Sequence, residues 1–201
     1  QSRGVAHQIS GGLHKIEISF PTKSLSMEGF DQKSMVTIGV SQIRDRIARL
    51  LDNVQVQQNI GENIATLSFS IKDEGLFYRN LKLITGNNLD FRTARITKNI
   101  YNADEIYQKE YVRGIADTCG FVRRSNRDQG GTHRVYVELQ HNNWKFPIDL
   151  CLLLQKHLEI PVQNIMWGHP NVRGKTSWAK EHDLRVYNHN FLEIGFYIDY
   201  K

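Results

Sequence analysis

Residues 133–139, with the sequence HRVYVEL, alternate polar and apolar side chains, and this stretch constrains the fold more than any other. Successive side chains of a strand point to opposite faces, so Val135, Val137 and Leu139 would share one apolar face. The opposite face would then carry Arg134, Tyr136, Glu138 and Gln140. Such alternation is typical of an antiparallel sheet that packs one face on a core and leaves the other in solvent.

A helix and a strand are predicted just before this stretch. Residues 104–118 place apolar side chains at helical spacing, and Gly120 follows at the point where a helix is expected to end. Residues 121–124 begin a strand, and the polar, glycine-containing residues 126–131 predict a turn into the next strand.

Further elements are predicted after the alternating strand. Residues 144–160 predict a second helix, with Pro147 near its first turn, where proline is tolerated. Two more strands are expected at 162–168 and 183–189, and residues 191–201 predict a closing helix or strand.

The first half of the chain is richer in strand signals. Residues 13–20 alternate like a half-buried strand, and residues 54–71 predict a hairpin. Helices are expected at 41–51, which begins with a serine, and at 75–86, and a short strand is expected at 92–96.

These elements predict an α+β fold in two parts. Residues 1–100 would form a β-rich half, and residues 101–201 would form the second half. The order of elements in the first half predicts either a diverged copy of the second half or a separate accessory region.

Charge and composition favour an anionic partner. The 201 residues carry a formal charge of +5, which favours binding to a polyanion. No glycine-rich phosphate loop or nucleophile elbow is present, which argues against a nucleotide-dependent enzyme or an acyl-transfer hydrolase. Cys119 and Cys151 do not suffice for a zinc site or a disulfide scaffold. No apolar run reaches the roughly 18 residues that span a bilayer, so we expect a cytoplasmic protein without a membrane partner.

The predicted helix before Gly120 ends in a motif. Val112–Gly120 reads VRGIADTCG, and Gly114, Asp117 and Gly120 fall on the two glycines and the first acid of the LAGLIDADG homing-endonuclease motif. Residues 103–201 resemble one repeat of that family. The resemblance implies a half-domain of order helix-strand-strand-helix-strand-strand-helix. It also implies that two motif helices pack closely through small residues such as Gly114, in a pseudo-dimeric chain or a homodimer.

The same resemblance implies a catalytic site. Asp117 would be a catalytic acid and a ligand of Mg²⁺, Gln140 would position water, and Lys201 would lie near the active site. Cys119 stands where cleaving members carry the metal-binding acid, and a thiol is a poor ligand for Mg²⁺. Cleavage would then depend on Asp117, or on a residue of the first half, to supply an oxygen ligand.

The resemblance further implies that the exposed face of the sheet lies in the major groove of double-stranded DNA, where arginine reads guanine bidentately. The polar loop around 173–180 would clamp phosphates. The candidate DNA-binding residues are Arg123, Arg124, Arg127, Arg134, Glu138, Gln140, Lys145, Arg173, Lys175 and Arg185.

Several functions stay open at this level. The first is a metal-dependent, site-specific DNA endonuclease of homing or restriction type, and the second is a DNA-binding regulator that has lost cleavage. A third is a protein-interaction domain without affinity for nucleic acid. Asp128 followed by Glu138 and Gln140 also loosely fits the PD-(D/E)XK nuclease pattern.

Overall fold

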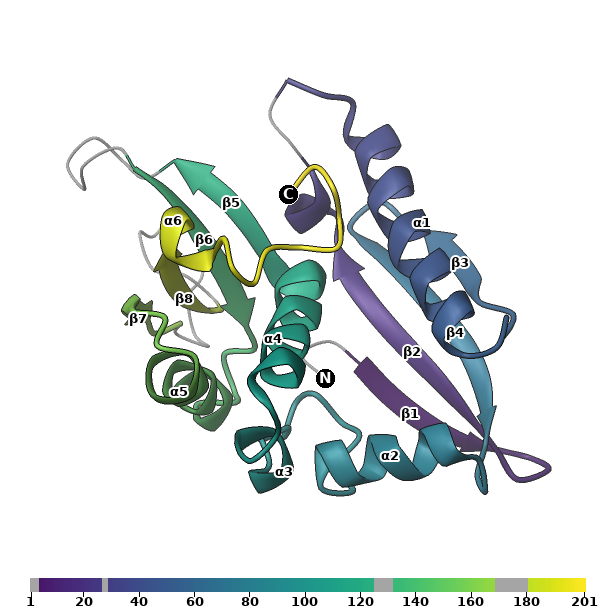
Figure 1. The fold of residues 1–201 in the computed structure, drawn as a ribbon. Coiled ribbons are helices and arrows are strands. Elements are labelled where there is room, and N and C mark those ends of the chain that lie inside the picture. Colours follow the sequence, from purple (N-terminus) through teal and green to yellow (C-terminus); the bar gives the residue numbers. More distant parts are fainter. Residues whose placement is uncertain (1–3, 27–28, 125–131, 169–180) are drawn as a thin grey trace. The chain divides into compact units, whose positions relative to one another are not determined.

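The chain divides into two units, each built on a four-stranded antiparallel sheet (Figure 1). Figure 1 shows the computed structural model, which describes residues 4–26, 29–124, 132–168 and 181–201. Unit 1 consists of Gln1–Phe91 with Tyr197–Lys201, and unit 2 consists of Arg92–Phe196. The α+β fold class predicted from the sequence is confirmed. Over the described residues, none of the helices is both long and apolar enough to cross a membrane.

Unit 1 places its sheet against a long helix. The strands pair in the order β1-β2-β4-β3. The elements are β1 (Gly4–Ile9), β2 (Leu13–Pro21), the short 3₁₀ helix η1 (Thr22–Leu25), α1 (Gln32–Leu50), β3 (Gln57–Ile60), β4 (Ile64–Lys72) and α2 (Leu76–Thr85). Phe20, Leu67 and Val40 are fully buried in the core between α1 and the sheet.

Helix α1 begins nine residues before the predicted start at Ser41. Asp31 caps it, because its carboxylate accepts a hydrogen bond from the Ser34 amide at 2.8 Å. Val36 and Val40 then extend the buried face of the helix toward its N-terminus. Residues 32–40 are rich in β-branched side chains, which are weak helix formers, so packing rather than local propensity decides this segment.

Unit 2 has the predicted order helix-strand-strand-helix-strand-strand-helix, after the one-turn helix α3 (Lys98–Tyr101). Its strands pair in the order β5-β6-β8-β7. The elements are α4 (Glu105–Cys119), β5 (Gly120–Arg124), β6 (His133–Leu139), α5 (Lys145–Leu152) with a π-helical turn η3 (Leu153–His157), β7 (Val162–Met166), β8 (His182–Tyr187) and α6 (Asn188–Phe191).

The two sheets have the same topology. In each, the second strand of one hairpin pairs with the second strand of the other, and a helix connects the hairpins. The helix is α1 in unit 1 and α5 in unit 2. A repeated ββαββα order is therefore present in both units.

Residues 92–96, predicted as a strand, form no strand. Ala94 and Ile96 are buried as alternation requires, at 0% and 5% exposure. Their backbone groups bond to side chains instead of to a strand: Asn143 donates its Nδ2 hydrogen to the Ala94 carbonyl at 2.9 Å, and the Ile96 amide donates to Asp149 at 3.1 Å. Polar side chains from the second half of the chain therefore replace the sheet ladder here.

The junction between α4 and β5 requires a glycine. A Cβ on Gly120 would lie 2.6 Å from the Ala116 carbonyl oxygen, which no real Cβ approaches. The predicted helix end at Gly120 is confirmed, and the strand starts at once.

The residues 197–201, the C-terminal segment, belong to unit 1 although the chain before them belongs to unit 2. Ile198 is 1% exposed in the core of unit 1, and the Tyr200 hydroxyl donates to the Met35 carbonyl at 2.7 Å. Gly39 gives room for this contact, since a Cβ there would overlap the Tyr200 hydroxyl. The closing helix or strand predicted for residues 191–201 is wrong, because α6 ends at Phe191 and the chain after it is irregular.

Candidate nucleic-acid interface

The sheet of unit 2 has one apolar and one polar face, as its sequence predicts, but the polar face is less open to solvent than expected, because Arg134 and Tyr136 are 1% and 6% exposed. Val135 and Val137 lie in the core at 0% and 2% exposure. Residues directly opposite each other in antiparallel strands share a face, and the register therefore defines the other side. This polar face of unit 2 consists of Phe121, Arg123, Arg134, Tyr136, Glu138, Asn164, Met166, Asp183, Arg185 and Tyr187.

Tyr136 lies at the centre of the polar face of unit 2. The Phe121 ring stacks on it with centroids 5.4 Å apart. The guanidinium carbon of Arg185 lies 5.0 Å from the Tyr136 ring centroid, and that of Arg123 lies 5.8 Å from it. Cation–π contacts of this kind favour orientations in which the arginines lie against the ring.

An ion pair lies beside Tyr136. Arg185 Nε donates to Asp183 Oδ2 at 3.0 Å, and the two side chains are only 14% and 13% exposed. Burial raises the pKa of Asp183 above its usual range, and the hydrogen bond from Arg185 opposes that rise. Glu138 lies opposite Asp183 in the strand pairing, and its negative charge raises the same pKa. The face therefore holds a buried carboxylate together with cations.

The structure brings some of the predicted DNA-binding residues together and separates others. Arg123 is exposed on the polar face of unit 2, whereas Arg134 on the same face is 1% exposed. Arg124, which pairs with His133, is the next residue after Arg123 on β5, so its side chain lies on the opposite face of the sheet. Lys145 is exposed on α5 rather than on the sheet. The predicted residues Arg127, Arg173 and Lys175, and Asp128 of the alternative nuclease pattern, lie outside the described residues.

The predicted catalytic residues do not form one cluster within either unit. Asp117 lies in the last turn of α4 at 1% exposure, and Gln140 follows β6 and is partly exposed. Lys201 belongs to unit 1. The Cys119 thiol is buried and donates to the Ile115 carbonyl at 3.2 Å, so it is a structural group of the core.

These residues do not fit a preformed Mg²⁺ site. Across the ranges that the structure describes, no three His, Cys, Asp or Glu side chains gather where they could hold a metal ion. Mg²⁺ keeps several waters in an octahedral shell, whereas Asp117 is only 1% exposed to solvent. Within its own unit, no described atom lies within 4 Å of a Cβ built on Gly114, so no close helix contact is present there.

Unit 1 carries a second polar face that the sequence reasoning missed. The register of β2, β3 and β4 places amide, hydroxyl and charged groups on the side away from the core. This polar face of unit 1 consists of Lys15, Glu17, Ser19, Gln57, Asn59, Thr66, Ser68 and Ser70. The signal was present in residues 64–71, where threonine and serine occupy every second position from Thr66 to Ser70.

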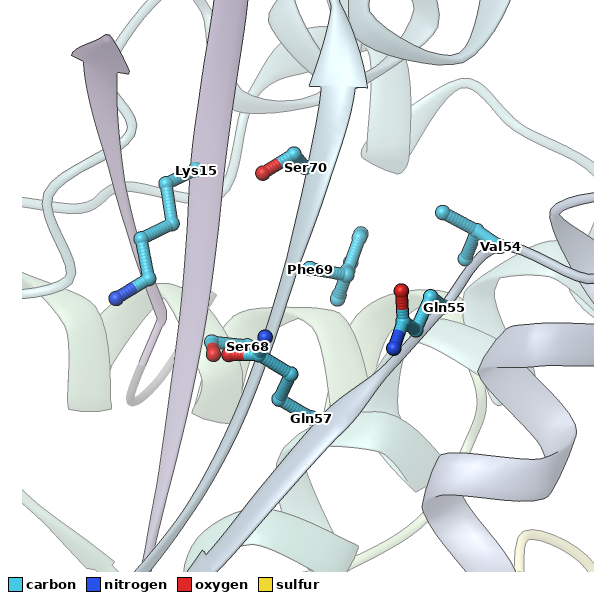
Figure 2. A pocket seen from close by; sticks show the side chains of 7 residues that line it. All are labelled: Lys15, Val54, Gln55, Gln57, Ser68, Phe69 and Ser70. Atoms are coloured by element: carbon cyan, nitrogen blue, oxygen red, sulfur yellow. The ribbon is translucent and has the colours of Figure 1, made fainter.

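A shallow depression of about 210 Å³ opens on the polar face of unit 1. Figure 2 shows Gln55 and Gln57 on one side of it and Ser68 and Ser70 on β4. Lys15, which makes an ion pair of 3.2 Å with Glu17, lines the opposite rim. The depression thus presents hydrogen-bond donors and acceptors with one cation.

No family model matches this chain, and no curated protein matches it. One solved structure, from a study of mesophilic variants of the homing endonuclease I-DmoI, is similar to it at a TM-score of 0.48 and 11% identity. The match covers 95% of this chain and 84% of that one. At these values the likeness carries neither fold nor function to this chain, and its own residues must supply both.

Proposed function

We propose that the chain binds double-stranded DNA in a sequence-specific manner, primarily through the polar face of unit 2. The observation that carries this proposal is the pair of arginines, Arg123 and Arg185, that lie against the Tyr136 ring on that face. The major groove admits a two-stranded β-ribbon, and arginine recognises guanine there by two parallel hydrogen bonds. The net charge of +5 supports attraction to the phosphates.

The polar face of unit 1 supports the same function. Glutamine and asparagine amides recognise adenine edges, and serine and threonine hydroxyls bond to any base. Gln57 and Asn59 alternate on β3 at the spacing of a strand face. We propose that this face contacts DNA as well, so that a single chain supplies two reading surfaces.

We propose binding without cleavage as the primary activity. The burial of Asp117 and the thiol at position 119 favour it, because hydrolysis of a phosphodiester in such a site needs an accessible metal ion. The second candidate is Mg²⁺-dependent cleavage of homing or restriction type involving Asp117, Gln140 and Lys201. The motif VRGIADTCG supports that candidate.

A selection from a randomised duplex library, over a salt series with and without Mg²⁺, tests these proposals. We expect one enriched site, with a logarithm of affinity that falls linearly with the logarithm of salt concentration. Arg123→Gln should weaken binding and reduce that slope by about 1 if Arg123 meets a phosphate, whereas Lys98→Gln, an exposed cation on α3, should change neither.

Each outcome of the selection has a definite meaning. Enrichment without cutting supports a regulator, and Mg²⁺-dependent cutting that is lost in Asp117→Asn supports the nuclease. Binding that does not respond to salt, or no binding, contradicts the DNA proposal and favours a protein-interaction domain. Light scattering of the complex distinguishes one chain per duplex from a homodimer.

A further inference from the structure

We propose that Asp183 is a positioning residue that presents Arg185 to a guanine in the bound duplex. This inference rests on the proposed function and names which base the polar face of unit 2 would read through its central arginine.

The strand register sets the geometry of this pair. Asp183 and Arg185 are two residues apart on β8, so both side chains lie on the polar face of unit 2. Arg185 Nε donates to Asp183 Oδ2 at 3.0 Å, and the Tyr136 ring lies opposite, 5.0 Å from the guanidinium carbon. The guanidinium is therefore fixed at its Nε edge by a carboxylate and at its plane by an aromatic ring.

The far end of the guanidinium is the part that reads guanine. Arg185 makes no other hydrogen bond in the described part of the chain, so Nη1 and Nη2 keep unused donors, although the side chain is only 14% exposed. Two parallel N–H groups match the O6 and N7 acceptors of guanine in the major groove. Orienting the fork before binding saves the entropy of ordering a long side chain in the complex.

The environment of Asp183 agrees with a functional role. Its side chain is buried, burial raises its pKa, and its Oδ1 has no hydrogen-bond partner among the described residues. A buried carboxylate with one unsatisfied oxygen is a costly way to stabilise a sheet. It also places a negative charge on a surface that faces phosphates, and the nearby cations Arg185 and Arg123 offset that cost.

The test compares base preference with overall affinity in Asp183→Asn. Removing a negative charge from a DNA-facing surface should raise non-specific affinity, whereas loss of positioning should lower the preference for guanine at one position. We expect Arg185→Gln to remove a preference of about 5- to 150-fold at a single position of the selected site. Asp183→Asn should remove most of that preference at the same position, with non-specific affinity unchanged or higher.

Further variants keep the outcome interpretable. Arg185→Lys keeps the charge and loses the planar fork, so it should lower the guanine preference at an unchanged salt slope. Asp183→Ser also removes the carboxylate and replaces Asp183→Asn if that variant does not fold. Glu193→Gln neutralises an exposed carboxylate that pairs with Lys109 elsewhere in unit 2 and should leave every base preference intact.

The failure of this inference differs from the failure of the proposed function. If Asp183→Asn keeps the guanine preference or weakens all positions equally, Asp183 does not position Arg185. The same result in Asp183→Ser contradicts the positioning role as well. If the unaltered chain shows no salt-dependent DNA binding, the proposed function itself is wrong.

Discussion

Replacing Arg95 by alanine should destabilise unit 2 more than replacing its partner Asp149 by asparagine. The Asp149 carboxylate is 8% exposed and accepts hydrogen bonds from Arg95 Nε at 2.5 Å, Arg95 Nη2 at 2.8 Å and the Ile96 amide at 3.1 Å. The Arg95 side chain is 50% exposed. Water can therefore solvate the cation when its partner is lost, but it cannot easily reach the anion.

The magnitudes follow from this asymmetry. Removing one partner of a buried pair costs about 3–5 kcal/mol. Because some water would enter where Arg95 leaves, we expect about 3 kcal/mol for Arg95→Ala. Asp149→Asn keeps an oxygen that accepts from the Ile96 amide and leaves a solvated guanidinium, so the lost charge-assisted bonds should cost about 1–2 kcal/mol.

Urea denaturation followed by tryptophan fluorescence measures these costs. All three tryptophans lie within residues 92–196, so the signal reports unit 2. Glu193→Gln, which breaks an exposed ion pair with Lys109, is the matched control and should leave the unfolding midpoint unchanged. A cost for Asp149→Asn that equals or exceeds that of Arg95→Ala would refute the argument from unequal exposure.

Three further predictions concern the frame that holds the polar faces, and a fourth concerns pH. Ile198→Ala should destabilise unit 1 by about 2–4 kcal/mol, because this side chain is 1% exposed in the core. Hydrogen exchange of peptides from unit 1 measures the loss, and unchanged protection would contradict the assignment of Ile198 to that core. Gly120→Ala should cost about 1–3 kcal/mol in thermal melts, since its Cβ would meet a backbone carbonyl. Gly114→Ala should instead stabilise helix α4 by up to about 1 kcal/mol, and a loss would point to the close helix packing that the sequence motif implies. Burial lowers the pKa of His182, so its contribution to stability is present above the unfolded pKa near 6.5 and is lost as pH falls. Between pH 7.5 and pH 5 the melting temperature should therefore fall less in His182→Gln than in the unaltered chain. Equal falls in melting temperature would contradict this assignment.

The elements that the sequence predicted best are those set by local patterns. The alternation of residues 133–139 identified β6 and its two faces, and Gly120 marked the end of α4. Both signals are local, because a strand repeats every two residues and a helix end needs a particular backbone.

Non-local packing accounts for what the sequence did not reveal. The N-terminal turns of α1 depend on contacts with the sheet and with Tyr200, which lies 165 residues after Met35 along the chain. The Arg185–Tyr136 contact joins strands that are distant in sequence, so no local pattern marks Arg185 as the central arginine. The burial of Asp117 and Arg134 could not be inferred either, since acids and arginines are usually exposed.

The return of the C-terminal segment to unit 1 has a consequence for biosynthesis. A ribosome completes Gln1–Phe91 long before it adds Ile198 and Tyr200, so the nascent first unit leaves open the core position that Ile198 later fills. The sequence of unit 2 is inserted between the two segments that form unit 1. All of unit 2 is therefore translated before unit 1 receives its last buried side chain. Nascent chains stalled before residue 197 should therefore expose apolar surface of unit 1 to chaperones, even when unit 2 has already folded.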